Sequence, residues 1–316
     1  MLTLDRITKV YKVGTFGGTN LPAVQDVSFN VDSGQVVSLI GESGSGKTTI
    51  GRMILRLTPT TRGSIFFDGQ DVARLPRRDY YRIVQGVFQD PFSSYNPIFK
   101  ADHVLGTIRS VYFGRMRDRE WDSRVEESLQ AVGLDPGQVL HKYPHQLSGG
   151  QLQRLLIARA LLLDIRLLVA DEIISMLDAS TRIDVLNLLG DLKARGLGIL
   201  FITHDLSLGY YSSEQTLILW RGKIVEMGST EKVYGNPVHP YTKMLIASVP
   251  LLHKKWRQVA QELGDVEHRQ SQDCAYHVMC PKPGSADARN GMQPLLAEVE
   301  EDHFVGCIRP YVAGTC

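Results

Sequence analysis

The feature that most constrains the fold of this chain is a glycine-rich loop between two segments of different periodicity. Residues 35–40 are mostly apolar and predict a buried strand, and residues 47–57 predict a helix. Between them, Gly41-Glu-Ser-Gly-Ser-Gly-Lys47-Thr48 has the spacing G-x-x-x-x-G-K-[ST]. In such a loop the backbone N–H groups and the N-terminus of the following helix surround a phosphate. The sequence therefore predicts an α/β fold with a phosphate-binding loop at the end of a strand.

The same loop supplies the predicted contacts of a nucleotide. Lys47 would reach the β- and γ-phosphates, and the Thr48 hydroxyl would bind Mg²⁺. The alternative, a glycine turn that merely precedes Lys-Thr, is disfavoured because a strand and a helix flank the loop in the required order. The predicted ATP contacts are Gly41, Glu42, Ser43, Gly44, Ser45, Gly46, Lys47, Thr48 and Thr49.

Two further apolar segments end in polar residues. The strand predicted at 166–170 is followed by Asp171 and Glu172. Asp171 at a strand end would hold Mg²⁺, and Glu172 would polarise the attacking water. The strand predicted at 198–203 is followed by His204, which would hydrogen-bond a γ-phosphate. Each of these residues taken alone would be an ordinary surface residue, and it is their order after the phosphate loop that indicates a hydrolytic site.

Two residues upstream belong to the same series. Gln89, in Val-Phe-Gln-Asp-Pro, would reach Mg²⁺ or the attacking water through its amide. Tyr11 would stack on adenine, although an aromatic residue in a strand is common without any such role.

Composition limits the class of protein. The chain has 316 residues with 43% hydrophobic and 22% charged, which is typical of globular proteins. Its 35 basic and 34 acidic residues give a net charge of +1, which argues against broad attraction to nucleic acid. No run approaches the roughly 18 apolar residues of a membrane span, and the N-terminus has no secretory signal. We therefore expect a cytoplasmic protein whose membrane contact comes through a partner.

The chain is expected to have three kinds of segment. Residues from about 1 to 92 alternate strands and turns, including an Asp68-Gly69 turn, and residues from about 93 to 160 show helical periodicity. The β/α pattern then returns, with a helix near 182–194. From 236 to 316 the pattern weakens to a loop, a short helix and a small appended region. We therefore predict one domain at 1–235 with a helical insertion, and an extension at 236–316.

Leu147-Ser-Gly-Gly-Gln151 makes the series more specific, because it resembles the signature of the ABC ATPases. The resemblance runs from Tyr11 to His204 and implies a RecA-like core with an antiparallel β-subdomain and a helical subdomain. It also implies that two ATP molecules are enclosed between two such subunits. The residues that would bind ATP in trans are Ser148, Gly149, Gly150, Gln151 and Asp178.

Three longer stretches are similar to the oligopeptide/dipeptide importer ATPases within that family. They are Val87-Phe-Gln-Asp-Pro-Phe-Ser-Ser-Tyr-Asn-Pro97, Tyr143-Pro-His-Gln-Leu-Ser-Gly-Gly and His239-Pro-Tyr-Thr-Lys-Met-Leu. The chain departs from the family at Ile173-Ile174, where Pro-Thr is usual, and at Met176, where alanine is usual. We interpret both as local repacking, since neither removes a chemical group that hydrolysis needs.

All four cysteines lie between residues 274 and 316, so a disulfide framework for the main fold is not expected. The resemblance implies a [4Fe–4S] cluster in this region, with Cys274, Cys280 and Cys307 at three of its positions and Asp287 where the fourth cysteine is usual. Cys316 or His303 is an alternative fourth ligand. The other interpretation, reduced thiols without a cluster, stays open.

The resemblance implies an ATPase subunit, on the cytoplasmic face of a membrane, that powers import of short peptides. Its partners would be a second ATPase subunit, with a heterodimer favoured, two permease subunits and an extracytoplasmic binding protein. Oligosaccharides are an alternative cargo. An ATPase chain does not contact the cargo, so its sequence does not distinguish the two. A different class, a soluble ABC ATPase acting on ribosomes or DNA, is disfavoured by the single cassette and the balanced charge.

Overall fold

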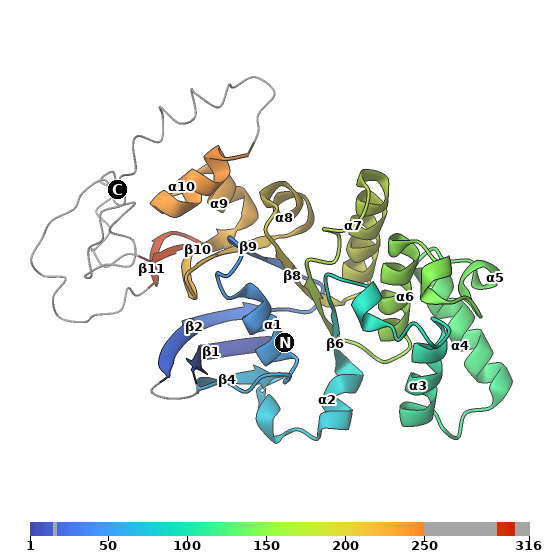
Figure 1. The fold of residues 1–316 in the computed structure, drawn as a ribbon. Coiled ribbons are helices and arrows are strands. Elements are labelled where there is room, and N and C mark those ends of the chain that lie inside the picture. The colour runs from blue at the N-terminus through green and yellow to red at the C-terminus, as the bar shows by residue number, and fades with distance from the viewer. Residues whose placement is uncertain (15–17, 250–295, 307–316) are drawn as a thin grey trace, which may run out of the picture.

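The computed structural model describes residues 1–14, 18–249 and 296–306. They form two β-sheets, helices that cover them, and a separate block of helices on one side (Figure 1).

The larger sheet has eight strands, and its parallel part lies in the centre. The strand order is β11-β12-β10-β9-β3-β8-β7-β6, and neighbours from β9 to β6 run parallel. Every residue of the three central strands is buried, as expected for parallel strands covered on both faces. The strands are β6 (Val84–Val87), β7 (Leu167–Asp171), β8 (Gly198–Thr203), β3 (Val36–Ile40), β9 (Gln215–Trp220), β10 (Lys223–Ser229), β12 (His303–Gly306) and β11 (Leu296–Glu300).

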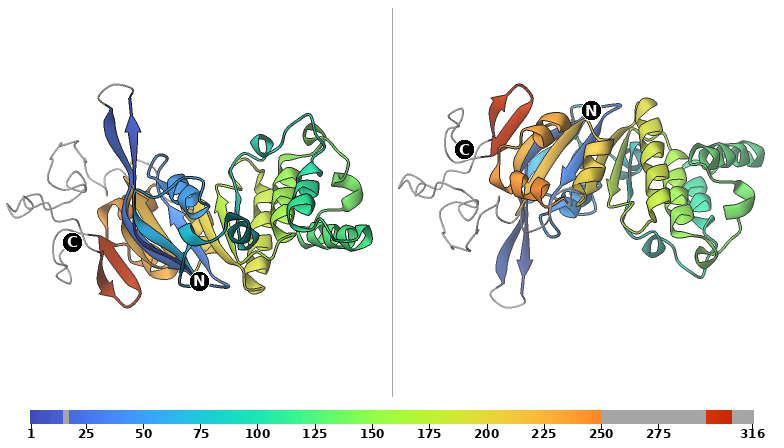
Figure 2. Two further views of the ribbon diagram at one scale, coloured as in Figure 1. Left: turned by 90° about the horizontal axis from the view of Figure 1, so that it is seen from below. Right: turned by 90° about the horizontal axis from the view of Figure 1, so that it is seen from above.

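The smaller sheet is antiparallel and packs over helix α1 (Lys47–Ile54). Apolar residues of both sheets and of α1 share one core. The Asp68-Gly69 turn is confirmed, and both residues have the positive φ that such a turn needs, 49° and 77°. The strands are β2 (Thr19–Val31), β1 (Leu2–Val13), β4 (Arg62–Phe67) and β5 (Gln70–Asp71), followed by η1 (Val72–Arg74) and α2 (Arg77–Ile83). Figure 2 shows the β1–β2 hairpin projecting from the body of the molecule.

The helical insertion forms a separate block at the far end of the molecule from β11 (Figures 1 and 2). Its helices surround a second apolar core that includes Leu129, Leu152 and Leu155, and this core continues to the face of the larger sheet. The block comprises η2 (Phe92–Ser94), α3 (His103–Tyr112), α4 (Asp118–Ala131), α5 (Pro136–Val139), η3 (Pro144–Gln146) and α6 (Gly149–Leu161). Helices α7 (Ala179–Ala194) and α8 (Leu206–Ser212) follow strands β7 and β8.

The described residues beyond 235 pack on the larger sheet. Helix α9 (Thr230–Gly235) leads into α10 (Pro240–Ala247), which shares a core with Ile40 and Trp220. Strand β12 pairs with β10, and a Cβ at Gly228 would lie 2.3 Å from the Asp302 carbonyl, so this pairing requires glycine. Strands β11 and β12 therefore continue the sheet of the main domain, which the weakening periodicity of this region did not predict. The boundary at 235/236 remains a proposal.

Candidate functional site

The candidate site lies where the central parallel strands end. Ile40 pairs with Thr203, and Asp171 pairs with Ile202, so β3, β7 and β8 finish at one edge of the sheet. The residues that follow these strands are consequently neighbours, as ligand-binding residues of open α/β sheets commonly are. This edge brings together the loop at 41–48, the acidic pair and His204.

The phosphate loop owes its path to its glycines. Gly44 and Gly46 have φ of 81° and 110°, which is the left-handed region that favours glycine. A Cβ on Gly46 would lie 2.4 Å from the carbonyl of Ala23, so no larger residue fits there. Among the described residues, the Ser45 hydroxyl is buried without a hydrogen-bond partner, which fits a loop whose polar groups serve a ligand.

Lys47 is buried and is held by the loop itself. Its Nζ donates to the carbonyl oxygens of Gly41 at 2.6 Å and Glu42 at 2.8 Å. Burial lowers the pKa of Lys47, and the nearby carboxylates of Glu172, Asp171 and Glu42 oppose that shift. The ammonium group is therefore already desolvated and kept beside the place where a phosphate would enter.

Thr48, Asp171 and Gln89 form a set of oxygen ligands. The Thr48 hydroxyl lies 3.4 Å from Oδ1 of Asp171, and both residues line a pocket of about 580 Å³ together with Gln89. Burial raises the pKa of Asp171, while the hydrogen bond from Thr48 opposes the rise. Hydroxyl, carboxylate and amide oxygens are ligands that Mg²⁺ accepts, so the residues present fit that ion.

Glu172 and His204 lie side by side at the same edge. Oε1 of Glu172 is 3.2 Å from Nδ1 of His204. The backbone of Glu172 has a φ of 51°, and it is held by its N–H donating to the Ile202 carbonyl at 2.9 Å. The Ser175 hydroxyl and N–H both donate to the Glu172 carbonyl. Since a positive φ is uncommon for glutamate, these bonds maintain a conformation that aims the carboxylate out of the strand.

Two of the residues that depart from the family pattern, Ile173 and Ile174, pack in the core, whereas the interpretation of Met176 as local repacking is wrong, because its side chain is exposed. Ile173 and Ile174 are 1% and 2% exposed and belong to the core beneath the helical block. Met176 is 59% exposed and takes no part in that core. The two isoleucines therefore repack the interior next to Glu172 without touching its carboxylate contact with His204.

The signature segment begins helix α6 in the helical block. Ser148 is its N-cap: its hydroxyl accepts from the N–H of Gln151 at 3.2 Å, and its own N–H donates to Oε1 of Gln151 at 2.9 Å. Gly150 is buried, and a Cβ there would lie 2.5 Å from Cγ2 of Thr181. Gly149 is more open, because the nearest atoms to a Cβ there are 3.9 Å away. Of the three residues that start this helix, Ser148 and Gly149 are thus accessible and Gly150 is not.

Asp178 caps helix α7. Its carboxylate accepts from Ser180 at 2.6 Å and from the N–H and hydroxyl of Thr181, and these bonds hold its pKa below the usual range. In the described part of the chain, the hydrogen bonds of Ser148 and Asp178 stay within their own segments. The structure therefore gathers the predicted residues into two groups: Lys47, Thr48, Gln89, Asp171, Glu172 and His204 at the sheet edge, and Ser148 to Gln151 with Asp178 at two helix starts.

Tyr11 lies on the β1–β2 hairpin. It pairs with Leu21, close to Ala23 at the phosphate loop, and the Lys9 ammonium lies 5.1 Å from its ring centre. The strand that borders the loop is β2, the hairpin partner of the strand that carries Tyr11, which is compatible with the predicted stacking role.

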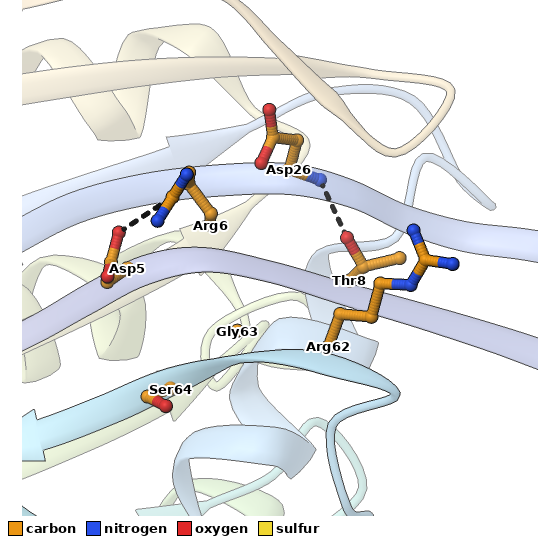
Figure 3. Close-up of a pocket in the computed structure, with 7 residues that line it drawn as sticks. All are labelled: Asp5, Arg6, Thr8, Asp26, Arg62, Gly63 and Ser64. Carbon is orange, nitrogen blue, oxygen red and sulfur yellow. Dashed lines mark hydrogen bonds and ion pairs between the residues drawn. The ribbon is translucent and has the colours of Figure 1, made fainter.

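A second pocket, of about 510 Å³, lies on the small sheet (Figure 3). It forms where the register of β1 shifts, and within it Arg6 pairs with Asp5 at 3.3 Å while the backbone N–H of Asp26 donates to the Thr8 hydroxyl at 3.1 Å. We attribute it to the bulges in the strands. Its lining residues are Asp5, Arg6, Thr8, Asp26, Arg62, Gly63 and Ser64.

One contact of the phosphate loop was not predicted. The N–H of Glu42 donates to the hydroxyl of Tyr241, at 3.2 Å. The only sequence signal near it was the His239-Pro-Tyr stretch, which indicated a family resemblance but did not predict that Tyr241 contacts the phosphate loop.

The tail residues fall into two sets. Cys274, Cys280, Asp287, Cys307 and Cys316 lie outside the described residues. His303 is described, and its proposed role as a fourth cluster ligand is wrong. Its ring is fully buried, with Nε2 at 2.8 Å from Glu226 and Nδ1 at 2.9 Å from Glu300, so both ring nitrogens are in contact with carboxylates.

Within the described ranges, no helix is long and apolar enough to span a bilayer.

Comparison with known proteins identifies the two parts of the chain. Residues 24–175 match the family model described as ABC transporter, and residues 225–286 match that described as oligopeptide/dipeptide transporter, C-terminal region. A putative peptide import ATP-binding protein of Brucella abortus is 40% identical, with 98% of each chain covered. The oligopeptide transport ATP-binding protein OppF of Bacillus subtilis is 37% identical, with 90% of each covered.

The fold has solved counterparts. A dimeric ATP-binding cassette in a post-hydrolysis state bound to ADP and Pi is 29% identical, with a TM-score of 0.64. The alignment covers 73% of this chain and 99% of that one. The likeness confirms the predicted cassette fold.

Proposed function

Because the chain belongs to the ABC transporter ATP-binding proteins of the oligopeptide and dipeptide import family, we infer that it binds and hydrolyses ATP to drive import of peptides. The observation that carries this inference is the meeting of Lys47, the Thr48–Asp171 pair and the Glu172–His204 pair at one edge of the sheet. The relatives named for peptide import favour peptides over oligosaccharides. They equally disfavour a soluble ATPase acting on ribosomes or DNA.

ATP is proposed to bind along residues 41–49. The N–H groups of the loop and of the first turn of α1 surround the phosphates, and Lys47 exchanges its carbonyl partners for phosphate oxygens. Such an exchange is favourable because the ammonium is already buried and gains a negatively charged partner. Tyr11 is proposed to stack on the adenine from the neighbouring hairpin.

Hydrolysis is proposed to depend on Glu172 as the group that accepts a proton from the attacking water. His204, 3.2 Å away, orients that carboxylate and lies where it would hydrogen-bond the γ-phosphate. Thr48 and Asp171, with the Gln89 amide, would hold Mg²⁺, which neutralises charge on the β- and γ-phosphate oxygens when bound. The role of the protein is thus to position the reacting groups and supply electrostatic stabilisation.

The second half of each ATP site is proposed to come from a partner subunit. Ser148 and Gly149 begin helix α6. The first backbone hydrogen bond of this helix runs from the N–H of Leu152 to the carbonyl of Ser148, so the N–H groups before Leu152 have no backbone partner within the helix. Such a helix start favours an anion. The related cassette that was solved as a dimer with ADP and Pi supports this arrangement. Gly150, Gln151 and Asp178 are proposed to complete this half of the site in trans. For the ATPase pair, we favour two different subunits.

The remaining partners are two permease subunits and an extracytoplasmic binding protein. We place this chain at the cytoplasmic face of the membrane, attached through the permeases.

A [4Fe–4S] cluster on Cys274, Cys280 and Cys307 with Asp287 stays a proposal supported by spacing alone. Anaerobically purified protein that contains neither iron nor acid-labile sulfide would exclude it.

The function is tested on the full-length chain purified within its membrane complex. Mass spectrometry identifies the companions, and ATP hydrolysis and uptake of a labelled pentapeptide are measured after reconstitution in vesicles. We expect both activities, and their loss with Lys47→Ala. Hydrolysis that is equal in wild type and Lys47→Ala, or complexes without a permease, would contradict the proposal.

A further inference from the structure

One peptide group of the phosphate loop is hydrogen-bonded on both sides. The carbonyl of Gly41 accepts from Lys47 at 2.6 Å, and the N–H of the same peptide, on Glu42, donates to the Tyr241 hydroxyl at 3.2 Å. In a trans peptide the C=O and N–H point in opposite directions, so the two side chains hold the plane from opposite sides. The orientation of this plane sets the direction of one of the two carbonyls that hold the Lys47 ammonium, the other being that of Glu42 at 2.8 Å.

Tyr241 is rigidly placed. It is fully buried, and its ring lies 5.6 Å from the ring of Trp220, in a core that also contains Ile40, the residue before the loop. Pro240 occupies the first position of α10, and Nδ1 of His239 accepts from the Tyr241 N–H at 3.1 Å. The start of α10 is therefore capped at the residue that touches the loop.

A buried carboxylate holds the start of α10 against the sheet. Glu226 on β10 is fully buried and accepts from the N–H of Val238 at 2.8 Å and of His239 at 2.9 Å. A third contact is Nε2 of His303 on β12, at 2.8 Å. A buried carboxylate is stable only when it is paired and hydrogen-bonded, and all three of these partners lie beyond residue 235. The carboxylate thus binds the C-terminal hairpin and α10 to the same strand.

We propose that Tyr241 is a positioning residue for the nucleotide site, and that Glu226 and His303 hold it in place. The inference rests on the proposed nucleotide site and deepens it, because it gives the residues beyond 235 a part in ATP binding. Without the Tyr241 hydroxyl, the Gly41–Glu42 peptide can rotate, and binding must then remove that additional freedom. Losing one such bond corresponds to a roughly 2- to 10-fold weaker affinity.

The test compares Tyr241→Phe with Tyr80→Phe in the full-length chain. Tyr80 is also fully buried, and its hydroxyl donates to the Ile54 carbonyl at 2.7 Å, at the far end of α1. Three quantities are measured: the Kd for MgATP, amide hydrogen exchange of the peptide covering residues 41–46, and the unfolding temperature without nucleotide. We expect Tyr241→Phe to weaken binding about 2- to 10-fold and to speed exchange in that peptide, and Tyr80→Phe to leave both unchanged.

A Tyr241→Phe variant with wild-type Kd and wild-type exchange, or equal effects in the two variants, would overturn the proposal. Glu226→Gln tests the second half, since one amide oxygen cannot serve three donors, and we expect it to speed exchange in residues 41–46 as well. If that variant does not fold, His303→Asn replaces it. Unchanged exchange would exclude the link through Glu226. Wild-type protein that binds no ATP would refute the nucleotide site, whereas the exchange measurement would still test the Tyr241 contact.

Discussion

Nδ1 of His204 lies 3.2 Å from Oε1 of Glu172, although the two residues follow different strands of the sheet. The contact exists because β7 and β8 are parallel neighbours whose ends coincide. A histidine beside a carboxylate can fix its orientation and share its proton, which is the arrangement that activation of a water molecule needs.

Replacing Glu172 with Gln is expected to preserve ATP binding and to lower the rate of hydrolysis by roughly 10²- to 10⁴-fold, because the amide cannot accept the proton. Turnover of the assembled complex and Kd for ATP are the measurements. Glu126→Gln, an exposed change on α4, is the matched control. Wild-type turnover in Glu172→Gln would show that another group acts as the base.

Ser148→Arg is expected to reduce turnover of the complex at least about 10-fold, since a long cation would enter the proposed interface while α6 loses its cap. Ser148→Ala separates the two effects, because it removes the cap without adding bulk. ATP binding by the isolated chain should be unaffected in both variants. If the arginine variant turned over ATP as fast as the alanine variant, the site in trans would be wrong.

The two glycines of the signature should differ in what they tolerate. Gly150→Ala places a Cβ 2.5 Å from Thr181, and Thr181 is itself bonded to Asp178, so we expect a loss of about 1–3 kcal/mol in the free energy of unfolding. At Gly149 the nearest atoms are at ordinary contact distance, and Gly149→Ala should change stability by less than about 0.5 kcal/mol. Denaturant unfolding of both variants measures the difference. Equal stability would mean that α6 and α7 are less closely packed than described.

His239 should make the protein sensitive to acid. Burial lowers the pKa of His239 from 6.5 to about 4, while the carboxylate of Glu226 opposes the shift and the ammonium of Lys243 adds to it. Because the pKa in the folded state lies below that in the unfolded state, the contribution to stability is present above pH 6.5 and is lost as the pH falls towards 4. The shift corresponds to about 3 kcal/mol.

The variant His239→Asn keeps an acceptor for the cap of α10 and removes the titration. The measurement is the free energy of unfolding of both proteins between pH 7 and pH 4, and we expect the wild type to lose more of it. His303 works in the opposite direction: burial lowers its pKa, but its hydrogen bonds to the carboxylates of Glu226 and Glu300 outweigh burial and raise the pKa, so its contribution is lost as the pH rises. Parallel curves for wild type and His239→Asn would contradict the prediction.

Much of the site was predictable because its parts are local. The loop at 41–48 requires a strand before it and a helix after it, and parallel strands place their carboxyl ends at one edge. The order of Lys47, Asp171, Glu172 and His204 along the chain was therefore enough to predict that they meet. The helical block was predictable for a similar reason, because the apolar periodicity of a helix depends only on residues within the same short segment.

The sequence by itself determined the α/β pattern, the helical insertion and the residues at the sheet edge, since strand, loop and helix signals there act over short distances; the cassette fold was implied by the family resemblance of the signature segment. Only the tertiary structure decided that β12 continues the sheet, that His303 pairs with Glu226 and that Tyr241 holds the Gly41–Glu42 peptide. Each of these contacts joins short segments that are far apart along the chain and have no periodic pattern. Their partners are selected by burial and by the need to hydrogen-bond a buried carboxylate, which become defined only when the chain is folded.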